Sequence, residues 1–500
     1  MSTSPSTIAA AIARSGPTRR RSTISSRPSA TPAADGLLPR DYHHEALLRL
    51  RQADGAEHRG ALDLLLTDSL VRYLYHQEFG KVAPVRLDAD WNLSRRFGDR
   101  DPIAFVEDAM RSGNLAGFTS DYLQRSGYYR QLKDLLATYR EQAASEGGGY
   151  PAVPAGPTLR KGMTDDRIPL LRARLQASEH LPASASTDDR TFDDALEDAV
   201  LAFQRDERID VDGAVGAGTL APLNVSLQAR IDQIRVNLER TRWVFRDVRE
   251  EDDFVVVNIA DFRAYLVRDH ATVWETKAQV GRTYRKTPVF EGKIKYAQFN
   301  PTWTVPPGIL RRDILPKIKA DRGYLDEKDM KLVDREGKEV DPASIDWDAV
   351  SAGRFPYQVV QRPGPENALG QVKFIFPNPH FVFLHDTPHK EHFDDQVRTF
   401  SSGCIRIEKP FEFARLLLDD PQWTDESIAD LIEAGQTKTV YLDEPLPVMV
   451  LYWTVVFGAD GEPRFLPDVY DRDGAVLAAL DAGFTVVPFD DFPEGLDAAP

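Results

Sequence analysis

The sequence predicts a multidomain α+β protein, in which a helical N-terminal part precedes a mainly β C-terminal part. Its 500 residues exceed one ordinary domain of about 150 residues, so about three folded units are expected. Apolar residues recur at helical spacing up to about residue 225, and short β-branched or aromatic runs between turn residues replace them after about residue 250. The hydrophobic share of 42% and charged share of 28% are those of a globular protein.

The first 40 residues are expected to form a disordered, basic, low-complexity tail. Ser, Thr, Ala and Pro dominate them, and Arg19 to Arg21 add positive charge. The apolar run from Ile8 to Ala13 is shorter than the hydrophobic core of a signal peptide, so it does not reveal an export route. No stretch reaches the roughly 18 apolar residues that cross a bilayer, and no transmembrane segment is predicted.

Residues 41–145 are predicted to form a helical scaffold domain. In "ALDLLLTDSLVRYLYHQEF", Leu64, Leu65, Tyr73 and Leu74 recur near helical spacing, and no chemistry is visible here. The Gly/Pro-rich stretch 146–157 is typical of a linker.

Residues 158–225 are predicted to form a small three-helix module. Two apolar stripes mark its helices: Ile168, Leu171 and Leu175, then Leu196, Val200 and Phe203. The stretch "DVDGAVGAGT" suggests a calcium loop, but Arg208 and Thr219 stand where acidic ligands are needed. A structural turn is therefore predicted at this position.

Residues 226–460 are predicted to form a mainly β domain, followed by a C-terminal segment over 461–500. Runs such as "FVVVNIADFRAYLV" and "KIKYAQFN" have strand character. The segment from about 308 to 356 is helical, then charged and loop-like. It interrupts the strands, so we interpret it as an insertion that covers a site as a cap.

Charge and cysteine content exclude several classes of protein. Asp and Glu outnumber Lys and Arg by 78 to 62, giving a net charge of -16, which argues against a nucleic-acid partner. A single cysteine excludes intramolecular disulfides and multi-thiolate zinc sites. Four of the ten histidines cluster, namely His380, His385, His389 and His392. Pro388 would break the helix that a zinc pair at i and i+4 requires, so no metal and no cofactor is predicted.

The only cysteine, Cys404, lies in "RTFSSGCIRIEKP" and has two interpretations. A free cysteine is often simply a buried small side chain. Yet "FIF", a turn and "FVFLH" predict a hairpin whose second strand ends at His385, which would supply a base. Gly403 permits a tight turn beside the thiol, and Pro410 suits the first turn of a following amphipathic helix. Amides around Gly403 and Cys404 would then supply an oxyanion hole.

The spacing of these residues resembles the signature of the L,D-transpeptidase catalytic domain. His385 is followed by fifteen residues and then by "SSGCIR" from Ser401 to Arg406. The resemblance continues through "NIADFRAYLV", "VGRTYRKTPVF" and "FNPTWTVPPGI" and covers most of residues 250–460. One departure is Ser402, where many members of the family have histidine.

Residues 158–225 resemble the peptidoglycan-binding three-helix module found beside cell-wall enzymes. Its "AVxxFQ" and "DGxVGxxT" elements stand at 199–204 and 212–219. A helical spacer with the same stripes is the alternative. The whole layout is similar to large periplasmic L,D-transpeptidases that carry an inserted capping subdomain.

The resemblance implies a cysteine transpeptidase that acts on peptidoglycan stem tetrapeptides. Cys404 would be the nucleophile, His385 the general base and acid, and Gly403 part of the oxyanion turn. The backbone carbonyl of Asp386 would orient His385, although the Asp386 side chain is an alternative orienter. Expected substrate-binding residues are Arg406, Ser401, Ser402, Trp303 and Tyr357.

The expected reaction releases D-Ala and joins two diaminopimelate residues, with the periplasm or cell envelope as its location. Water or a lipoprotein as acceptor would instead make the protein an L,D-carboxypeptidase or a lipoprotein-attaching enzyme. A non-catalytic peptidoglycan-binding scaffold is the alternative of a different class. Peptidoglycan is the expected partner, with other cell-wall enzymes as further candidates.

Overall fold

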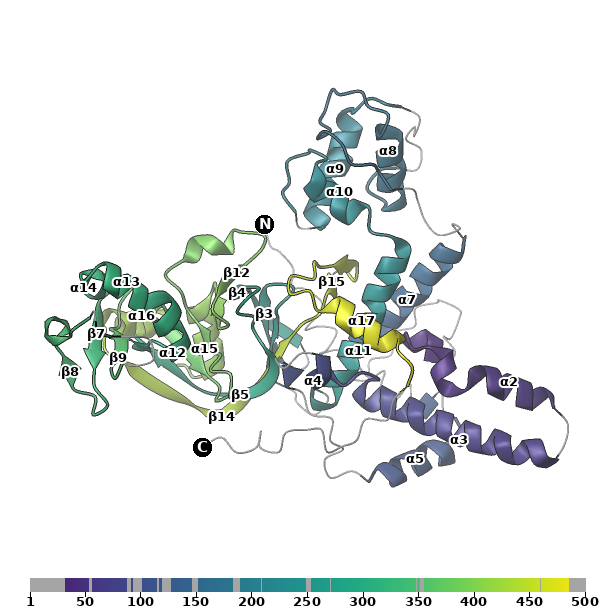
Figure 1. Ribbon diagram of the computed structural model, residues 1–500, viewed down its shortest axis with the longest axis horizontal. Helices are drawn as coiled ribbons and strands as arrows, with labels where there is room; N and C mark the ends of the chain where they lie inside the picture. Colours follow the sequence, from purple (N-terminus) through teal and green to yellow (C-terminus); the bar gives the residue numbers. More distant parts are fainter. Residues whose placement is uncertain are drawn as a thin grey trace. The chain divides into compact units, whose positions relative to one another are not determined.

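We describe the protein from a computed structural model (Figure 1). It describes residues 32–53, 56–87, 91–92, 101–114, 117–118, 127–145, 152–182, 189–207, 209–248, 253–269, 271–347, 349–350, 355–458 and 460–484. The chain forms two compact units. The first comprises residues up to 252 together with 267–272 and 452–493, and the second comprises 253–266 and 273–451. The expected disorder of residues 1–31 lies outside the described residues.

The N-terminal part of the first unit is helical. Its elements are η1 (Pro32–Asp35), η2 (Pro39–Tyr42), α2 (His44–Gln52), α3 (Ala56–Phe79), α4 (Pro84–Leu87), β1 (Trp91–Asn92), α5 (Pro102–Arg111) and α7 (Gly127–Ser145). Residues 32–40, which we had placed in the tail, are instead folded. Asp35 is buried and forms an ion pair with the ammonium of Lys133 at 2.8 Å, a long-range contact that composition does not reveal.

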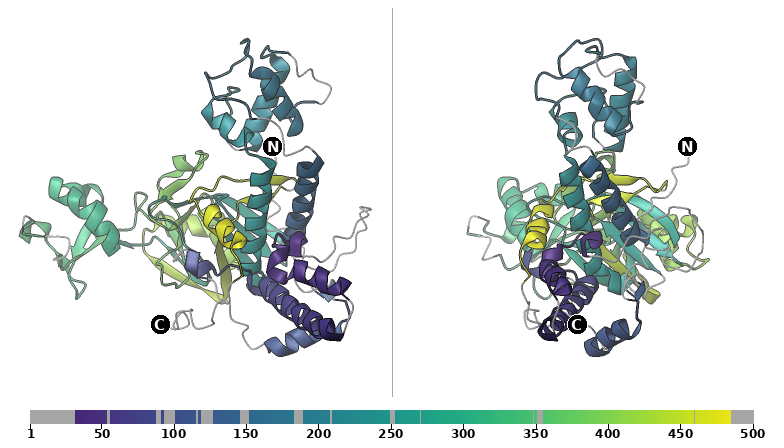
Figure 2. Two further views of the ribbon diagram at one scale, coloured as in Figure 1. Left: turned by 45° about the vertical axis from the view of Figure 1, so that its right-hand side comes forward. Right: turned by 90° about the vertical axis from the view of Figure 1, so that its right-hand side faces the viewer.

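The small module contains α8 (Ile168–Ala177), α9 (Asp194–Asp206) and α10 (Ala217–Leu223), whose coils lie together in Figure 2. Both predicted stripes are buried in one core. The stretch predicted as a turn is held by Gln204, whose side-chain amide donates to Asp212 Oδ1 at 3.0 Å and to the Ala214 carbonyl at 2.9 Å. Gly213 has a φ of +67°, as a tight turn requires.

A long helix, α11 (Leu227–Val248), follows the module and lies beside α7 (Figure 2). The C-terminal elements β15 (Val455–Phe457), β16 (Pro463–Phe465) and α17 (Asp473–Asp481) complete this unit. Buried Asn237 of α11 accepts hydrogen bonds from the amides of Thr454 and Val455 at 2.8 and 3.2 Å. The rings of Tyr128 and Trp453 stack with their centroids 4.5 Å apart.

The second unit is built on a sheet in the order β5, β10, β11, β13, β4, β3, β2, β14. These strands are β2 (Phe254–Asn258), β3 (Arg263–Arg268), β4 (Ala271–Gly281), β5 (Val289–Phe299), β10 (Val372–Ile375), β11 (Leu384–His385), β13 (Ile405–Ile407) and β14 (Lys438–Leu451). A further strand, β12 (Thr399–Ser401), pairs with β4. Because the long strand β14 pairs with both β2 and β5, the path of pairings closes on itself.

Helices α15 (Pro410–Leu418) and α16 (Asp425–Glu433) and the short η5 (Lys390–Phe393) accompany this sheet. The predicted helix after Pro410 is present, and its Phe413 packs into the core against the rings of Phe374 and Trp274. Of the predicted strand "FVFLH", only Leu384 and His385 are extended. The expectation was too long because Phe381 takes a φ of +55°.

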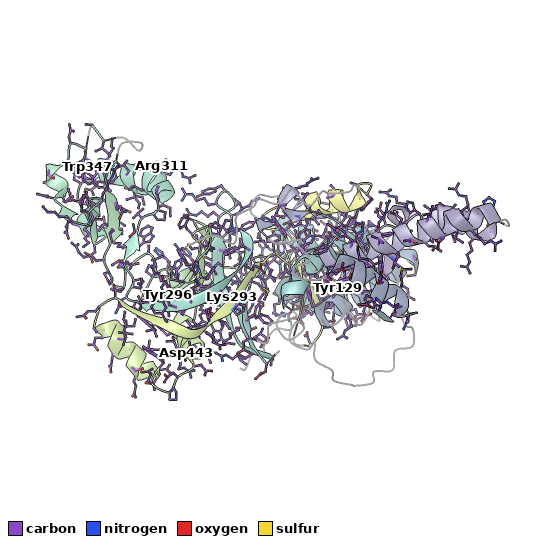
Figure 3. All side chains as sticks on the ribbon, turned by 90° about the horizontal axis from the view of Figure 1, so that it is seen from below. Tyr129, Lys293, Tyr296, Arg311, Trp347 and Asp443 are labelled. Carbon is purple, nitrogen blue, oxygen red and sulfur yellow. The ribbon has the colours of Figure 1, made fainter. Side chains whose placement is uncertain are left out.

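The inserted segment forms a small subdomain, here called the cap, from Trp303 to Gln361. It contains α12 (Pro307–Ile309), η3 (Leu310–Ile314), α13 (Leu315–Ala320), α14 (Tyr324–Glu327) and η4 (Pro342–Ser344), with a sheet β6-β9-β7-β8 of β6 (Trp303–Thr304), β9 (Gln358–Gln361), β7 (Met330–Val333) and β8 (Glu339–Val340). Figure 3 labels Trp347 and Arg311 here, and Tyr296 and Lys293 on β5. Trp347 belongs to an apolar core of the cap itself.

The protein is thus a mixed α+β multidomain protein, as its sequence predicts. Among the described residues, none of the helices combines the length and the apolar character that crossing a membrane requires.

Candidate active site

A hairpin between β10 and β11 carries His385. Lys373 lies opposite His385 in this antiparallel pairing. Asn378 closes the connecting turn, because its side-chain amide donates to the carbonyls of Phe376 and Val382 at 2.7 and 2.8 Å. His385 therefore lies on a paired strand in the middle of the sheet, where its side chain is 3% exposed.

The turn that precedes β13 presents Cys404. Ser401 Oγ accepts a hydrogen bond from the Gly403 amide at 3.0 Å and donates to the Cys404 carbonyl at 2.5 Å. From the other side, Thr287 Oγ1 donates to the Gly403 carbonyl at 2.8 Å. Gly403 has a φ of +119°, which L side chains rarely adopt, so the turn requires glycine.

The prediction that the Gly403 amide contributes to an oxyanion hole is wrong. The Gly403 amide already donates to Ser401 Oγ and is not available to a developing oxyanion. The Cys404 amide, in contrast, has no hydrogen-bond partner within the described part of the chain. Gly403 therefore contributes its backbone conformation, and the Cys404 amide is the remaining candidate donor.

Strand pairing aligns four side chains in what we call the polar row: Lys373, His385, Arg406 and Gln279. Each neighbouring pair is directly opposite, across β10, β11, β13 and β4. Opposite residues project from the same face of a sheet. Cys404 precedes Arg406 by two residues and so shares that face, with its Cα about 8 Å diagonally from that of His385. An imidazole on one strand reaches a thiol at this spacing.

The other face of the same strands is the core. Phe374, Leu384 and Ile405 alternate with the polar row and are 0% exposed. A shift of one residue in the pairing would turn the polar row toward the apolar core and the apolar side chains toward the opposite face. The hydrophobic core thus sets the register that places Cys404 and His385 on the same face of the sheet.

His385 is held as a neutral imidazole. Its Nδ1 lies 2.5 Å from the backbone oxygen of Asp386. A carbonyl only accepts, so Nδ1 carries the proton and Nε2 keeps its lone pair. Burial, joined by the charge of Arg406 and more weakly of Lys373, lowers the pKa of His385 from 6.5 to about 3, although the backbone of Asp386 and Leu369 opposes this. The ring is therefore an unprotonated base at neutral pH.

Cys404 is held as a neutral thiol. Its surroundings raise the pKa of the thiol by desolvation, which the Phe383 backbone and the charges of Arg406 and Lys373 only partly offset. The side chain remains partly exposed, and Sγ lies 3.7 Å from the Phe381 carbonyl. Both groups are thus neutral at rest, so an attack by the Cys404 thiol would need a base to take its proton.

Ser402 is linked to the cap through an arginine. Arg285 Nη1 donates to Ser402 Oγ at 2.9 Å and forms an ion pair with Asp313 of η3 at 2.7 Å. The Asp313 carboxylate raises the pKa of Arg285, and the Arg285 guanidinium in turn lowers the pKa of Asp313. Ser402 therefore faces a charged link to the cap, at the position where the signature more often has histidine.

The remaining predicted residues fall into two groups. The Asp386 carboxylate accepts the Gln371 amide at 2.9 Å and pairs with Lys390 at 2.5 Å, so its backbone oxygen, not its side chain, contacts His385. Trp303 packs against the core of the cap, and the Tyr357 ring contacts Phe355 at 5.6 Å. Within the described residues, no hydrogen bond or ring contact joins either aromatic residue to Cys404 or His385.

The other clustered histidines are separate from this pair. His380 packs on the ring of Phe290 at 5.1 Å, and His392 stacks on Phe400 at 4.1 Å. His389 is exposed beside Glu391. No group of three or more potential metal ligands occurs in the described ranges.

The sequence analysis did not identify Lys373, Gln279, Arg285 or Thr287. The alternation in "VKFIF" predicts that Lys373 and Phe374 point to opposite faces of the sheet. It does not predict which strand lies beside Lys373. Arg285 and Thr287 belong to "VGRTYRKTPVF", which carried the family resemblance without a role for either residue.

Three family models match the chain. Residues 252–439 match the YkuD model, described as "L,D-transpeptidase catalytic domain", and residues 12–136 match a "Scaffold domain". Residues 164–223 match a "Putative peptidoglycan binding domain".

A "Putative L,D-transpeptidase" from Haemophilus influenzae is 36% identical over 225 residues, which is 45% of this chain and 45% of that protein. The chain thus aligns with less than half the length of this curated relative.

Solved structures give weaker matches. An L,D-transpeptidase from Stackebrandtia nassauensis aligns at 14% identity and a TM-score of 0.21, covering 61% of this chain and 97% of that one. One from Xylanimonas cellulosilytica aligns at 12% identity and a TM-score of 0.16, covering 59% and 98%. Scores this low support no argument about function.

The match of residues 252–439 to the L,D-transpeptidase catalytic domain indicates a transferase-type enzyme domain. The chain thus contains a region at 252–439 that is similar to L,D-transpeptidase catalytic domains and a region at 164–223 that is similar to peptidoglycan-binding domains.

Proposed function

We propose that the protein is an L,D-transpeptidase that acts on peptidoglycan stem tetrapeptides through a thioester on Cys404. It would release D-Ala and form crosslinks between two diaminopimelate residues at the cell envelope. The observation that carries the proposal is the pairing of β11 with β13, which sets an Nδ1-anchored imidazole beside the only thiol.

In the first half-reaction, His385 Nε2 takes the thiol proton while Cys404 Sγ attacks the carbonyl between diaminopimelate and D-Ala. The Cys404 amide stabilises the oxyanion. The tetrahedral intermediate collapses with cleavage of the C–N bond, and His385 returns the proton to the leaving amine. A thioester remains on the protein, and D-Ala departs.

In the second half-reaction, the side-chain amine of a second stem peptide attacks the thioester. His385 accepts a proton from this amine, and the proton passes to the departing sulfur. Ser401 acts by holding the turn, and Arg406 by attracting a carboxylate of the substrate. Ser402, Trp303 and Tyr357 stay as proposed substrate contacts from the cap side.

The accessory parts fit the same substrate. We propose the domain limits of the sequence analysis, except that residues 32–40 are folded, and we propose that the module at 158–225 binds glycan strands for the catalytic domain. Its closed apolar core and family match support this role. A full chain whose module is disrupted would then lose co-sedimentation with sacculi.

Muropeptide tetrapeptides provide the test. Mass analysis after incubation distinguishes a crosslinked dimer, a tripeptide formed by water and unchanged substrate. We expect the dimer, and its absence with Cys404→Ala. Tripeptide alone would indicate a carboxypeptidase, and unchanged substrate with no carbapenem adduct on Cys404 would favour a non-catalytic scaffold.

A further inference from the structure

Two basic side chains flank His385 in the polar row, and neither has an acidic partner within the described part of the chain. Lys373 lies on one side of His385 and Arg406 on the other. Lys373 has no ion pair or side-chain hydrogen bond among these residues. The Arg406 guanidinium contacts the uncharged Gln279 at 3.2 Å, and its buried Nε has no partner there.

Two carboxylates that are close in sequence to His385 and Arg406 form ion pairs with other lysines. Asp386 pairs with Lys390, and Glu408 lies 3.2 Å from the ammonium of Lys277. Burial lowers the pKa of both Lys373 and Arg406, since a desolvated cation without a counter-ion is unfavourable.

Several basic side chains with little exposure have a carboxylate within 2.8 Å: Lys81 with Asp41, Lys133 with Asp35, and Arg242 with Glu239. Buried Arg398 instead donates to backbone carbonyls, among them those of Ala278 and Phe262. The half-buried Lys373 and Arg406 have no carboxylate partner in the described part of the chain, which suits a site whose anion arrives with a ligand.

We propose that Lys373 and Arg406 together form a carboxylate-binding site beside Cys404, with Lys373 as a further substrate-binding residue. The inference rests on the proposed function, because it takes the anion to be a carboxylate of the donor peptide. Two strand spacings separate the Cα atoms of Lys373 and Arg406 by about 10 Å. A carboxylate bound by both would lie on the face of the sheet that carries His385.

Occupancy of this site has a consequence for the base. Lys373 and Arg406 both act to lower the pKa of His385. A bound carboxylate offsets their field, so it raises the pKa of the imidazole and also that of the Cys404 thiol, which the same two cations lower.

Alkylation of Cys404 tests the site directly, since the chain has only one cysteine. Iodoacetate and iodoacetamide differ by one negative charge, and the ratio of their rate constants reports the local field. At about 8 Å and an effective dielectric of about 20, one cation changes this ratio by on the order of thirtyfold. We expect Lys373→Met to lower the ratio of the iodoacetate rate constant to the iodoacetamide rate constant by this factor, and Lys373→Arg to restore it. In the unaltered protein, added salt should lower the ratio. Lys295→Met, at an exposed position on β5, is the matched control and should keep the ratio.

An unchanged ratio in Lys373→Met would overturn the proposal. Equal slowing of alkylation by both reagents would overturn it too, because Lys373 would then act only on the reactivity of the thiol. The unaltered protein gives an independent measurement. N-acetyl-D-alanine should protect Cys404 from iodoacetamide, and its carboxamide should not; equal protection would overturn the site.

Alkylation needs no turnover, so the two proposals fail separately. A lowered ratio with no muropeptide product would refute the proposed function alone. A crosslinked product with an unchanged ratio would refute the carboxylate site alone.

Discussion

Replacing His385 by glutamine is expected to remove a pH-dependent loss of stability in the second unit. Burial and Arg406 lower the pKa of His385 from 6.5 to about 3. Between these values the unfolded chain binds a proton at this position and the folded chain does not. Stability therefore falls as the pH falls through this window, and glutamine, which does not titrate, abolishes that contribution.

The magnitude follows from the shift. Each pH unit below 6.5 lowers the free energy of unfolding by about 1.4 kcal/mol. Between about pH 8 and about pH 5 the loss works out at about 2 kcal/mol, and it approaches about 5 kcal/mol near pH 3.

Hydrogen exchange of the amides in β11 and β13 measures this effect where it arises. Opening free energies, corrected for intrinsic exchange, should fall by about 2 kcal/mol more in the unaltered chain than in His385→Gln over that pH range. His389→Gln is the control, because the His389 side chain is 58% exposed. Equal pH dependence in the unaltered chain and His385→Gln would refute the assigned burial of a neutral imidazole.

Three further predictions concern the turn and the module. Gly403→Ala should lower stability by about 1 kcal/mol and slow Cys404 alkylation, because φ of +119° disfavours a side chain; unchanged alkylation would contradict it. Thr287→Val should cost roughly 1 to 3 kcal/mol by leaving the Gly403 carbonyl unpaired, seen as a lower melting temperature, whereas an unaltered melt would count against it. Gln204→Leu should make the module sensitive to proteolysis by unpairing its turn, and unchanged cleavage would show that the turn holds without these bonds.

Much of the fold was accessible from local patterns. Periodicity predicted the helices of the module and the helix after Pro410, because their apolar stripes face single cores. The predicted N-terminal tail was too long. Asp35 belongs to the fold, because it forms an ion pair with Lys133, about a hundred residues away in sequence. The strand before His385 was also too long, because Asn378 and the positive φ of Phe381 end the turn late.

The candidate site divides in the same way. Residue type and spacing in the sequence identified Cys404 and His385 as candidates. Gly403 predicted a tight turn beside the thiol. The engagement of the Gly403 amide by Ser401 Oγ was not predictable, because a backbone donor has no sequence signal of its own. Lys373 and Arg285 come from separate segments, so their nearness to Cys404 depends on strand and loop pairing.

By itself, the sequence determined the class of each segment, the thiol and the base, because side-chain chemistry and periodicity are local properties. Only the tertiary structure decided which side chains share the face of Cys404. The pairing of β10, β11 and β13 is set by burial of Phe374, Leu384 and Ile405 on the opposite face. That long-range register places His385 between two cations that have no carboxylate partner in the described ranges, and burial there keeps the imidazole neutral.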